Sequence, residues 1–238
     1  IGVIGTGGMG QGHLDGMLSA RAAGRERFDV VALCDVNRKR VLEARAKLAT
    51  GAPDVAVETY RHYPELLERD DVHAVLIASP EHWHSKMAED AIAAGKDVYL
   101  EKPMTLRLPQ ALRLKQVVEA NDCILQVGTQ YMMYPKYAEA RRLIGAGAIG
   151  VPTLSQTSYC RNSRDGEWLY GIDPEVQPGD VLDWEAWLGL EHGLSDAIPF
   201  DTEIYHRWRR YKDFSTGIVG DLLPHMMTPM MWCLDAGW

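Results

Sequence analysis

Three glycines near the amino end constrain the fold more than any other feature of the chain. Gly5, Gly7 and Gly10 follow directly on a short apolar run at residues 1–4. In a strand-loop-helix unit with this spacing, the first glycine makes a tight turn and the second lets the backbone approach a pyrophosphate. The third lets the helix pack close to the strand. The amino end of that helix then offers N–H groups and a positive dipole to phosphates. We therefore predict a dinucleotide-binding loop made of Gly5, Thr6, Gly7, Gly8, Met9 and Gly10.

The residues that follow decide whether this pattern is more than a glycine-rich turn. Residues 14–18 carry an apolar stripe with helical spacing, and an apolar run at residues 30–34 ends at Asp35. An acidic residue at the tip of the second strand accepts hydrogen bonds from the adenosine ribose and repels a 2′-phosphate. Asp35 therefore favours NAD as the cofactor, while the basic run at residues 38–40 counters that repulsion and leaves NADP open.

Apolar runs of strand length alternate with helical segments as far as residue 127. Strands are predicted at residues 55–57, 74–78, 98–100 and 124–127, and a helix precedes each of the last three, near residues 65–68, 84–94 and 108–121. Short links between alternating strands and helices are typical of a doubly wound parallel sheet. We predict an α/β chain whose residues 1–128 form a Rossmann domain.

The pattern changes after residue 128. A helix is predicted at residues 135–144 and a polar-rich strand of the antiparallel kind at residues 153–159. Residues 160–215 show little regular period, and a long irregular loop is usually functional. The last segment, from residue 219, has apolar residues at helical spacing. Because one strand cannot make a sheet, we expect its partners to lie beyond residue 238 and predict that residues 129–238 form an incomplete second domain.

Composition excludes several classes of function. The chain has 238 residues, a net charge of −8 and 46% hydrophobic residues. It has no apolar run near the ~18 residues of a membrane span, and an acidic chain does not suit nucleic acid or an anionic membrane. One basic and aromatic run, at residues 207–212, is interpreted as a solvated loop or an interface strip. The four cysteines have no metal-binding spacing and suit a reducing, cytoplasmic compartment, although an exported form with a removed leader stays open.

Two strand ends carry the candidate chemistry, because ligands of such sheets bind outside the carboxyl ends of the strands. Ser79-Pro80-Glu81-His82-Trp83-His84 follows one strand and Glu101-Lys102-Pro103 the next. Lys102 could hold a substrate hydroxyl, or act as acid or base if burial lowers its pKa; the alternative is a solvated surface lysine. His82 and His84 lack a nearby third ligand, so no metal site is predicted.

Asp221 and His225 stand four residues apart near the end of the chain. On one helix they would share a face, which would place a carboxylate near an imidazole. The alternative is that Asp221 caps a helix that begins just after it, since Pro224 fits only the first turn of a helix.

Together these motifs resemble the Gfo/Idh/MocA family of NAD(P)-dependent oxidoreductases. The resemblance rests on the glycine loop, residues 79–84, residues 93–103 with Glu-Lys-Pro, and residues 217–225 with Asp-x-x-x-His. It implies a Rossmann domain followed by an α/β domain with an open, mostly antiparallel sheet, which often forms homo-oligomers. Two departures limit it: Pro224 lies between Asp221 and His225, and much of the family's sheet domain is absent from the chain.

The resemblance also assigns roles to residues. It implies a catalytic group made of Lys102, Asp221 and His225. Glu101 and Lys102 are placed at the nicotinamide end with Gln130, and the cofactor is expected to run along Ser79, Pro80, His82 and His84.

The function predicted from all this is hydride transfer between NAD(P) and a secondary alcohol of a sugar or cyclic polyol. A hydroxyl-rich substrate needs hydrogen-bonding and stacking groups, for which the later loops offer Tyr159, Arg161, Asn162, Trp168, Tyr205 and Arg207 beside Lys102, Asp221 and His225. Two alternatives stay open: an NAD-dependent glycoside hydrolase that works by transient oxidation, and a non-enzymatic NAD-binding sensor or scaffold.

Overall fold

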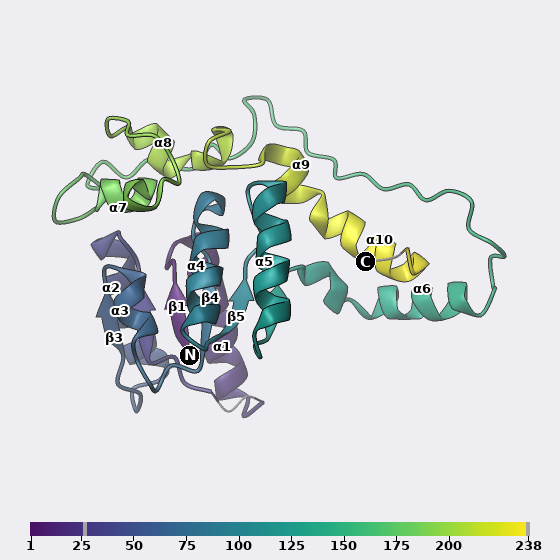
Figure 1. The fold of residues 1–238 in the computed structure, drawn as a ribbon, viewed down its shortest axis with the longest axis horizontal. Helices are drawn as coiled ribbons and strands as arrows, with labels where there is room; N and C mark the ends of the chain where they lie inside the picture. The colour runs from purple at the N-terminus through teal and green to yellow at the C-terminus, as the bar shows by residue number, and fades with distance from the viewer. Residues whose placement is uncertain (26–27, 237–238) are drawn as a thin grey trace.

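A single parallel sheet organises the computed structural model, which describes residues 1–25 and 28–236. Its six strands are β1 (Gly2–Ile4), β2 (Ala32–Cys34), β3 (Glu58–Tyr60), β4 (Ala74–Ile77), β5 (Asp97–Leu100) and β6 (Leu125–Val127). They lie in the order β3-β2-β1-β4-β5-β6, and Val3 of β1 pairs with Leu33 on one side and Leu76 on the other. The order reverses between β1 and β4, as in doubly wound sheets. The predicted α/β fold class is confirmed (Figure 1).

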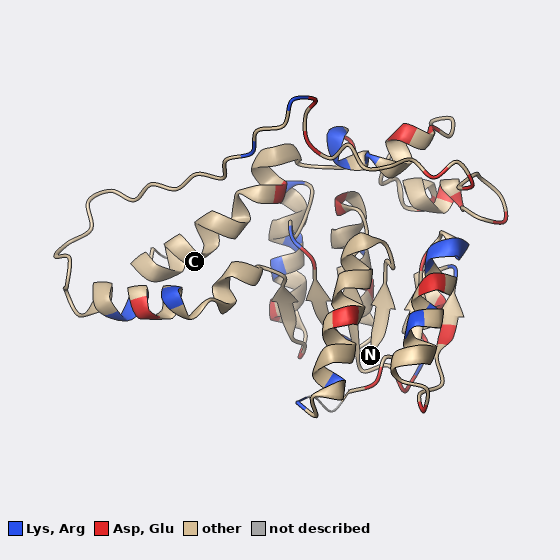
Figure 2. Ribbon diagram, turned by 180° about the vertical axis from the view of Figure 1, so that it is seen from behind, with Lys and Arg blue, Asp and Glu red and all other residues tan. Residues whose placement is uncertain are grey.

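Helices cover both faces of the sheet: α1 (Gly8–Ala22), α2 (Arg38–Gly51), α3 (Tyr63–Leu67), α4 (Glu81–Ala93) and α5 (Leu108–Ala120). Figure 2, seen from behind, shows α1 and α2 on one face, and Figure 1 shows α4 and α5 on the other. Alternate strand residues therefore enter two cores. Val3 and Leu33 pack with Leu14 and Leu48, while Ile77 packs with α4 and α5. Burial on both faces explains why β1, β2 and β4 are continuous apolar runs.

Two boundaries differ from the prediction. The third strand is Glu58–Tyr60 and not residues 55–57, because Glu58 pairs with Ala32 while Val57 packs into the core under α2. Helix α4 begins at Glu81, three residues earlier than predicted, directly after the extended Pro80. The whole sequence Glu81-His82-Trp83-His84 is therefore the first turn of α4.

After β6 the chain forms η1 (Gln130–Met133) and α6 (Pro135–Gly145) and then runs extended and exposed. The strand predicted at residues 153–159 is not formed, because it meets no partner strand in the part of the chain that the structure describes, and a strand needs a ladder to satisfy its backbone groups. The antiparallel sheet expected for the second domain likewise has no counterpart among the described residues.

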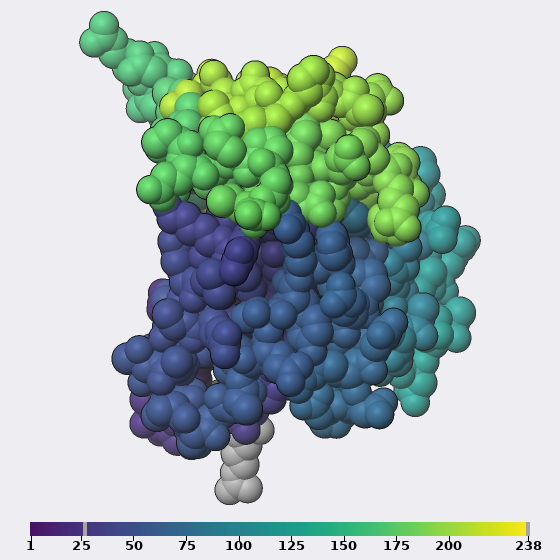
Figure 3. All heavy atoms as spheres, turned by 90° about the vertical axis from the view of Figure 1, so that its left-hand side faces the viewer, coloured from purple at the N-terminus to yellow at the C-terminus, as the bar shows by residue number. Residues whose placement is uncertain are grey.

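Residues 173–215, which we call the crossing segment, lie over the carboxyl ends of the strands (Figure 1, Figure 3). The prediction of an irregular loop was wrong for this part, since it contains α7 (Trp184–Leu188), η2 (Leu190–His192), α8 (Thr202–His206) and η3 (Trp208–Arg210). These short pieces share one core that includes Trp187, Tyr205 and Phe214. Aromatic packing, not helical period, gives the segment its structure.

The chain then forms α9 (Gly217–Leu222) and α10 (Pro224–Leu234). Asp221 lies in α9 and His225 in α10, so the single helix expected to carry both is interrupted at Leu223, before Pro224. Asp221 is not the cap of the last helix either. Helix α10 packs on α6, where the Arg141 Nη1 donates to the Trp232 carbonyl at 2.8 Å. Among the described helices, none combines the length and apolar character that a membrane span requires.

Candidate active site

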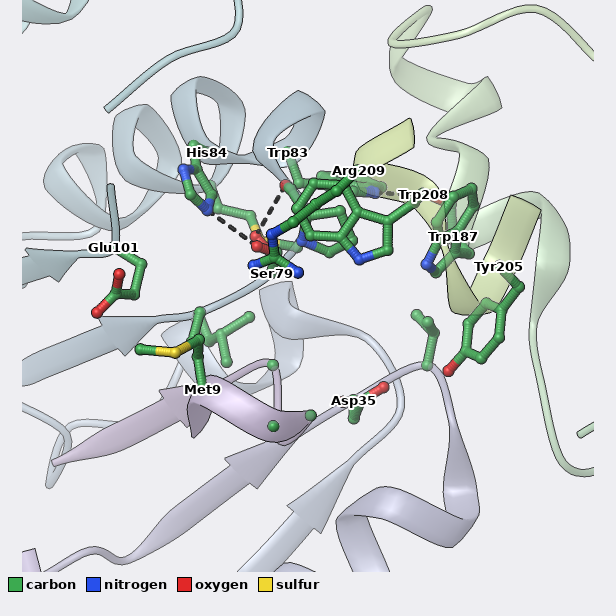
Figure 4. A pocket seen from close by; sticks show the side chains of 18 of the residues that line it. Met9, Asp35, Ser79, Trp83, His84, Glu101, Trp187, Tyr205, Trp208 and Arg209 are labelled. Atoms are coloured by element: carbon green, nitrogen blue, oxygen red, sulfur yellow. Dashed lines mark hydrogen bonds between the residues drawn. The ribbon is translucent and has the colours of Figure 1, made fainter. Parts of the chain in front are cut away.

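A cavity of about 840 Å³ lies between the carboxyl edge of the sheet and the crossing segment. Figure 4 shows Met9 and Asp35 on the sheet side and Trp208 and Arg209 opposite them. Both halves of the chain therefore build its walls, which is the usual situation of a ligand site at the switch point of such a sheet.

The glycine loop has the shape and polarity that a pyrophosphate needs. A Cβ added to Gly10 would lie 2.0 Å from the Gly5 carbonyl oxygen, and Gly5 has a φ of +89°, so both positions require glycine. Gly7, Gly8 and Met9 line the cavity, while Thr6 is buried beneath it. No side chain caps the amino end of α1 and its first turn holds no acidic residue, which leaves the N–H groups there available to an anion. The loop fits the dinucleotide that the sequence predicts.

Asp35 lies at one end of the cavity, held by its neighbours. Its Oδ2 accepts from the Thr6 N–H at 2.8 Å, and its Oδ1 accepts from the Asn37 N–H at 2.8 Å. The Arg40 guanidinium stands over the Tyr205 ring, 5.0 Å from its centroid, and lines the same cavity. Lys39, by contrast, is bound to the carboxylates of Asp173 and Glu175, at 2.7 and 2.6 Å. Arg40 is therefore the basic residue of this run placed to meet a 2′-phosphate.

Lys102 joins the two halves of the chain at the other end of the cavity. Its Nζ donates to the Asp221 Oδ1 at 2.8 Å and to the Asp221 carbonyl at 3.1 Å. The two side chains are only 10% and 4% exposed, so this ion pair is shielded from solvent. The Arg209 Nε lies 3.5 Å from the same Oδ1. The Lys102-Pro103 peptide is cis. The preceding residue, Glu101, places its Oε1 2.7 Å from the His13 Nε2. Lys102 is not the solvated surface lysine of the alternative interpretation.

His225 lines the cavity beside this pair and is 6% exposed. Burial lowers its pKa, the Lys102 charge lowers it further, and the carboxylate of Asp221 opposes both. Its Nδ1 has no hydrogen-bond partner among the described residues, and the Tyr131 ring packs 5.1 Å from its own. A neutral imidazole of this kind keeps a lone pair and can accept a proton.

Residues 79–84, at the start of α4, include cavity residues and structural ones. Ser79, Pro80 and His84 line the cavity, and His84 bridges the Ser79 and Pro103 carbonyls at 2.9 and 2.6 Å. His82 does not line it: its Nε2 donates to the Trp187 carbonyl at 2.9 Å, and burial lowers its pKa to about 4. Across the described residues no cluster of three metal-ligating side chains occurs.

The predicted substrate residues divide in the same way. Tyr159, Arg161 and Trp168 line the cavity, whereas Asn162 and Arg207 are not among its lining residues; Gln130, predicted for the cofactor, also lines it. Tyr205 lines it at the Asp35 end, where the Asn37 Nδ2 donates to its hydroxyl at 2.8 Å. Arg207 instead donates from its Nε to the Tyr170 carbonyl at 3.0 Å.

Several lining residues were not predicted from the sequence, among them Trp187, Trp208 and Arg209. The last two belong to the basic and aromatic run at residues 207–212, which the sequence analysis interpreted as a solvated loop or an interface strip. That run was the available signal, because cationic and aromatic side chains side by side suit an anionic or planar ligand.

A parallel sheet with an open glycine loop, an acid after β2 and a shielded lysine after β5 defines a dinucleotide-binding oxidoreductase class. Residues 1–129 match the profile of the oxidoreductase family with an NAD-binding Rossmann fold, GFO_IDH_MocA. The chain belongs to this family, as the sequence motifs predicted.

Individual relatives are consistent with that assignment. The chain is 29% identical to an inositol 2-dehydrogenase of Gluconacetobacter diazotrophicus, over 99% of this chain and 63% of the relative. It is 30% identical to a D-xylose 1-dehydrogenase (NADP(+)) of Hypocrea jecorina, over 76% and 49%. The crystal structure of an oxidoreductase domain protein from Kribbella flavida superimposes with a TM-score of 0.66 and 25% identity, over 98% of this chain and 53% of that one. The chain thus spans less than two thirds of the length of these relatives.

Proposed function

We propose that the protein transfers a hydride between NAD(P) and a secondary alcohol of a sugar or cyclic polyol. The observation that carries this proposal is the shielded Lys102-Asp221 pair beside His225 in a cavity that also contains the glycine loop. The relatives reported above are named for inositol and xylose, which supports a polyhydroxylated substrate. They are named as dehydrogenases, so neither a glycoside hydrolase nor a sensor is proposed.

The cofactor would extend along the cavity from Asp35 to Glu101. The glycine loop would hold the pyrophosphate, Asp35 the adenosine ribose, and Glu101 with Gln130 the nicotinamide end. Bound there, the nicotinamide supplies the carbon that accepts or donates hydride. The Asp35 carboxylate favours NAD, and the Arg40 guanidinium would allow NADP to bind as a second cofactor.

The chain's own residues would manage the substrate proton. The Lys102 ammonium has three N–H donors, and Asp221 accepts two of them, which leaves one for the substrate oxygen. His225 would accept the hydroxyl proton at an imidazole nitrogen, because its lowered pKa keeps the ring neutral at physiological pH. Asp221 would hold the Lys102 amine in place through its carboxylate and its carbonyl.

We also propose that residues 1–128 form one domain and residues 129–238 part of a second. The last strand of the sheet ends at Val127, which supports this boundary. The described cysteines are all free thiols, which supports a cytoplasmic location. Val151 and Leu154 are 87% and 84% exposed, and such apolar exposure supports contact with another copy in a homo-oligomer.

The test mixes the protein with NAD or NADP and a panel of inositols, aldoses and uronates, and follows the absorbance of NAD(P)H. We expect at least one polyol to produce reduced cofactor, and Lys102→Ala to abolish the signal. Binding of NADH without turnover of any member of the panel would contradict the proposal.

A further inference from the structure

Glu81 is a buried carboxylate outside the cavity. It is the first residue of α4 and 1% exposed, and it is not among the residues that line the site. Its Oε1 accepts from the Ser215 hydroxyl at 2.8 Å, and its Oε2 accepts from the Thr216 N–H at 2.6 Å and the Thr216 hydroxyl at 2.8 Å. All three donors are neutral and lie more than 130 residues further along the chain. A buried carboxylate is costly to keep, so three specific partners indicate a definite role.

These bonds reach the start of α9 through a relay. The Ser215 Oγ that donates to Glu81 also accepts from the Gly217 N–H at 3.1 Å, and Gly217 is the first residue of α9. Gly217 has a φ of +68°, and a Cβ on Gly220 would lie 2.0 Å from the Thr216 Oγ1. The turn between Thr216 and Gly220 is therefore tightly constrained, and Glu81 holds it at Thr216.

Helix α9 carries the far side of the site. Asp221 is its fifth residue and holds the Lys102 ammonium, and α10 with His225 follows after Leu223. Lys102 follows β5 at the edge of the sheet, so the catalytic geometry depends on how α9 is seated against α4. Displacement of a reacting group by about 1 Å can cost about a hundredfold in rate.

We propose that Glu81 is a positioning residue, which seats α9 through Ser215 and Thr216 so that Asp221 and His225 meet Lys102. This inference rests on the proposed dehydrogenase function. Glu81 would contact neither the cofactor nor the substrate. Its substitution should therefore change turnover without changing cofactor binding.

Three substitutions of Glu81 distinguish position from charge. Glu81→Gln keeps the length of the side chain and one acceptor oxygen, Glu81→Asp keeps the charge but loses reach, and Glu81→Ala loses both. We expect kcat to fall about tenfold in the Gln variant, further in the Asp variant, and about a hundredfold in the Ala variant, with the Kd for NADH within about twofold of the parent. An Asp variant near the parent beside a Gln variant as poor as Ala would overturn the proposal, because Glu81 would then act through its charge.

The hydrogen-bond partners of Glu81 allow a double-mutant cycle, and helix α4 itself offers a matched control. Ser215→Ala and Thr216→Val remove two of the three donors, and we expect their effects on kcat to be much smaller in the Glu81→Ala background than in the parent. Additive effects would contradict a shared mechanism. The control is Glu89→Gln on the same helix, where Glu89 binds Ser85 and the exposed Arg113, and kcat should not change.

Amide hydrogen exchange gives a readout independent of activity. In Glu81→Ala we expect the amides of residues 217–222 to exchange about tenfold faster or more, while those of β4 and β5 keep their protection. If no polyol is oxidised by the parent but α9 exchanges faster in the variant, the proposed function fails and the seating role stands. Unchanged exchange in α9 would overturn the seating role itself.

Discussion

The two halves of the molecule acquire their structure in different ways. The sheet and its helices, residues 1–127, consist of strands and helices whose own periodicity matches their burial. In the second half, residues 128–238, the crossing segment has helices of five residues or fewer, which are too short to be stable alone. It is held by bonds to the first half. Examples are the Trp187 carbonyl, which accepts from His82 and Trp83, and Tyr205, which binds Asn37. The structure of the first half follows from local sequence pattern, whereas that of the second half forms only in contact with the first.

The site follows this division. The proposed cofactor contacts, the glycine loop and Asp35, belong to the first half, whereas the proposed proton chemistry needs Lys102 from the first half and His225 from the second. Binding of the cofactor and turnover should therefore respond differently to substitutions in the two halves. Four experiments test how the two halves depend on each other.

The largest effect is expected where the halves meet in the proposed chemistry. Lys102→Ala and His225→Ala should each lower kcat about a thousandfold, because each removes a group that acts on the substrate hydroxyl. The double variant should be little worse than either single one, as for residues that act as a unit. Steady-state rates with the best polyol from the panel measure this. Lys115→Ala, whose side chain is 70% exposed, is the control, and two additive losses would show that the residues act separately.

The same division decides what the sequence could predict. The glycine loop, Asp35 and Lys102 each follow a strand at a fixed offset, and the carboxyl ends of parallel strands share an edge, so local pattern was enough to bring them together. Asp221 and His225 were predicted by resemblance, and the structure brings them to the same cavity.

The structure of the crossing segment could not be predicted from local sequence pattern. Its core of Trp187, Tyr205 and Phe214 joins residues without helical or strand period. Tyr205 was predicted to face the substrate, but it lies at the Asp35 end because Asn37 and Arg40 hold it there. The strand predicted at residues 153–159 shows the same dependence, since an extended segment becomes a strand only beside a partner.

The second largest effect tests the half that is locally determined. Gly10→Ala places a methyl group 2.0 Å from a backbone oxygen, so the loop and α1 must move apart. We expect a loss of about 3 kcal/mol in the free energy of unfolding and no measurable NADH binding. Gly12→Ala is the matched control, because a Cβ there meets nothing within 4 Å. Urea unfolding and NADH fluorescence measure both, and equal behaviour of the two variants would contradict the close-packed loop.

A smaller effect concerns acid and the contact between the halves. The pKa of His82 falls from an ordinary value near 6.5 to about 4 in the folded protein. Between these values the unfolded chain binds a proton that the folded chain excludes, so stability falls as the pH falls through this window, by about 1 kcal/mol per pH unit. His82→Gln keeps a donor for the Trp187 carbonyl without titrating, so its urea midpoint should depend less on pH. Trp83→Phe removes the other donor to that carbonyl and should lower stability equally at each pH. A Gln variant with the pH profile of the parent would contradict this origin.

The smallest effect tests a single bond between the halves. The Asn37 side chain caps α2 by accepting from the Arg40 N–H at 3.2 Å and donates to the Tyr205 hydroxyl at 2.8 Å. Tyr205→Phe loses only the second bond and keeps the ring under Arg40, so we expect it to lower the free energy of unfolding by about 1 kcal/mol. Asn37→Ala loses the cap as well, and should cost about 1 kcal/mol more. In a double-mutant cycle of urea midpoints, a coupling of about 1 kcal/mol measures what one hydrogen bond contributes to holding the crossing segment on the sheet. A coupling near zero would mean that aromatic packing alone holds this segment, which would make the second half less dependent on the first than its hydrogen bonds indicate.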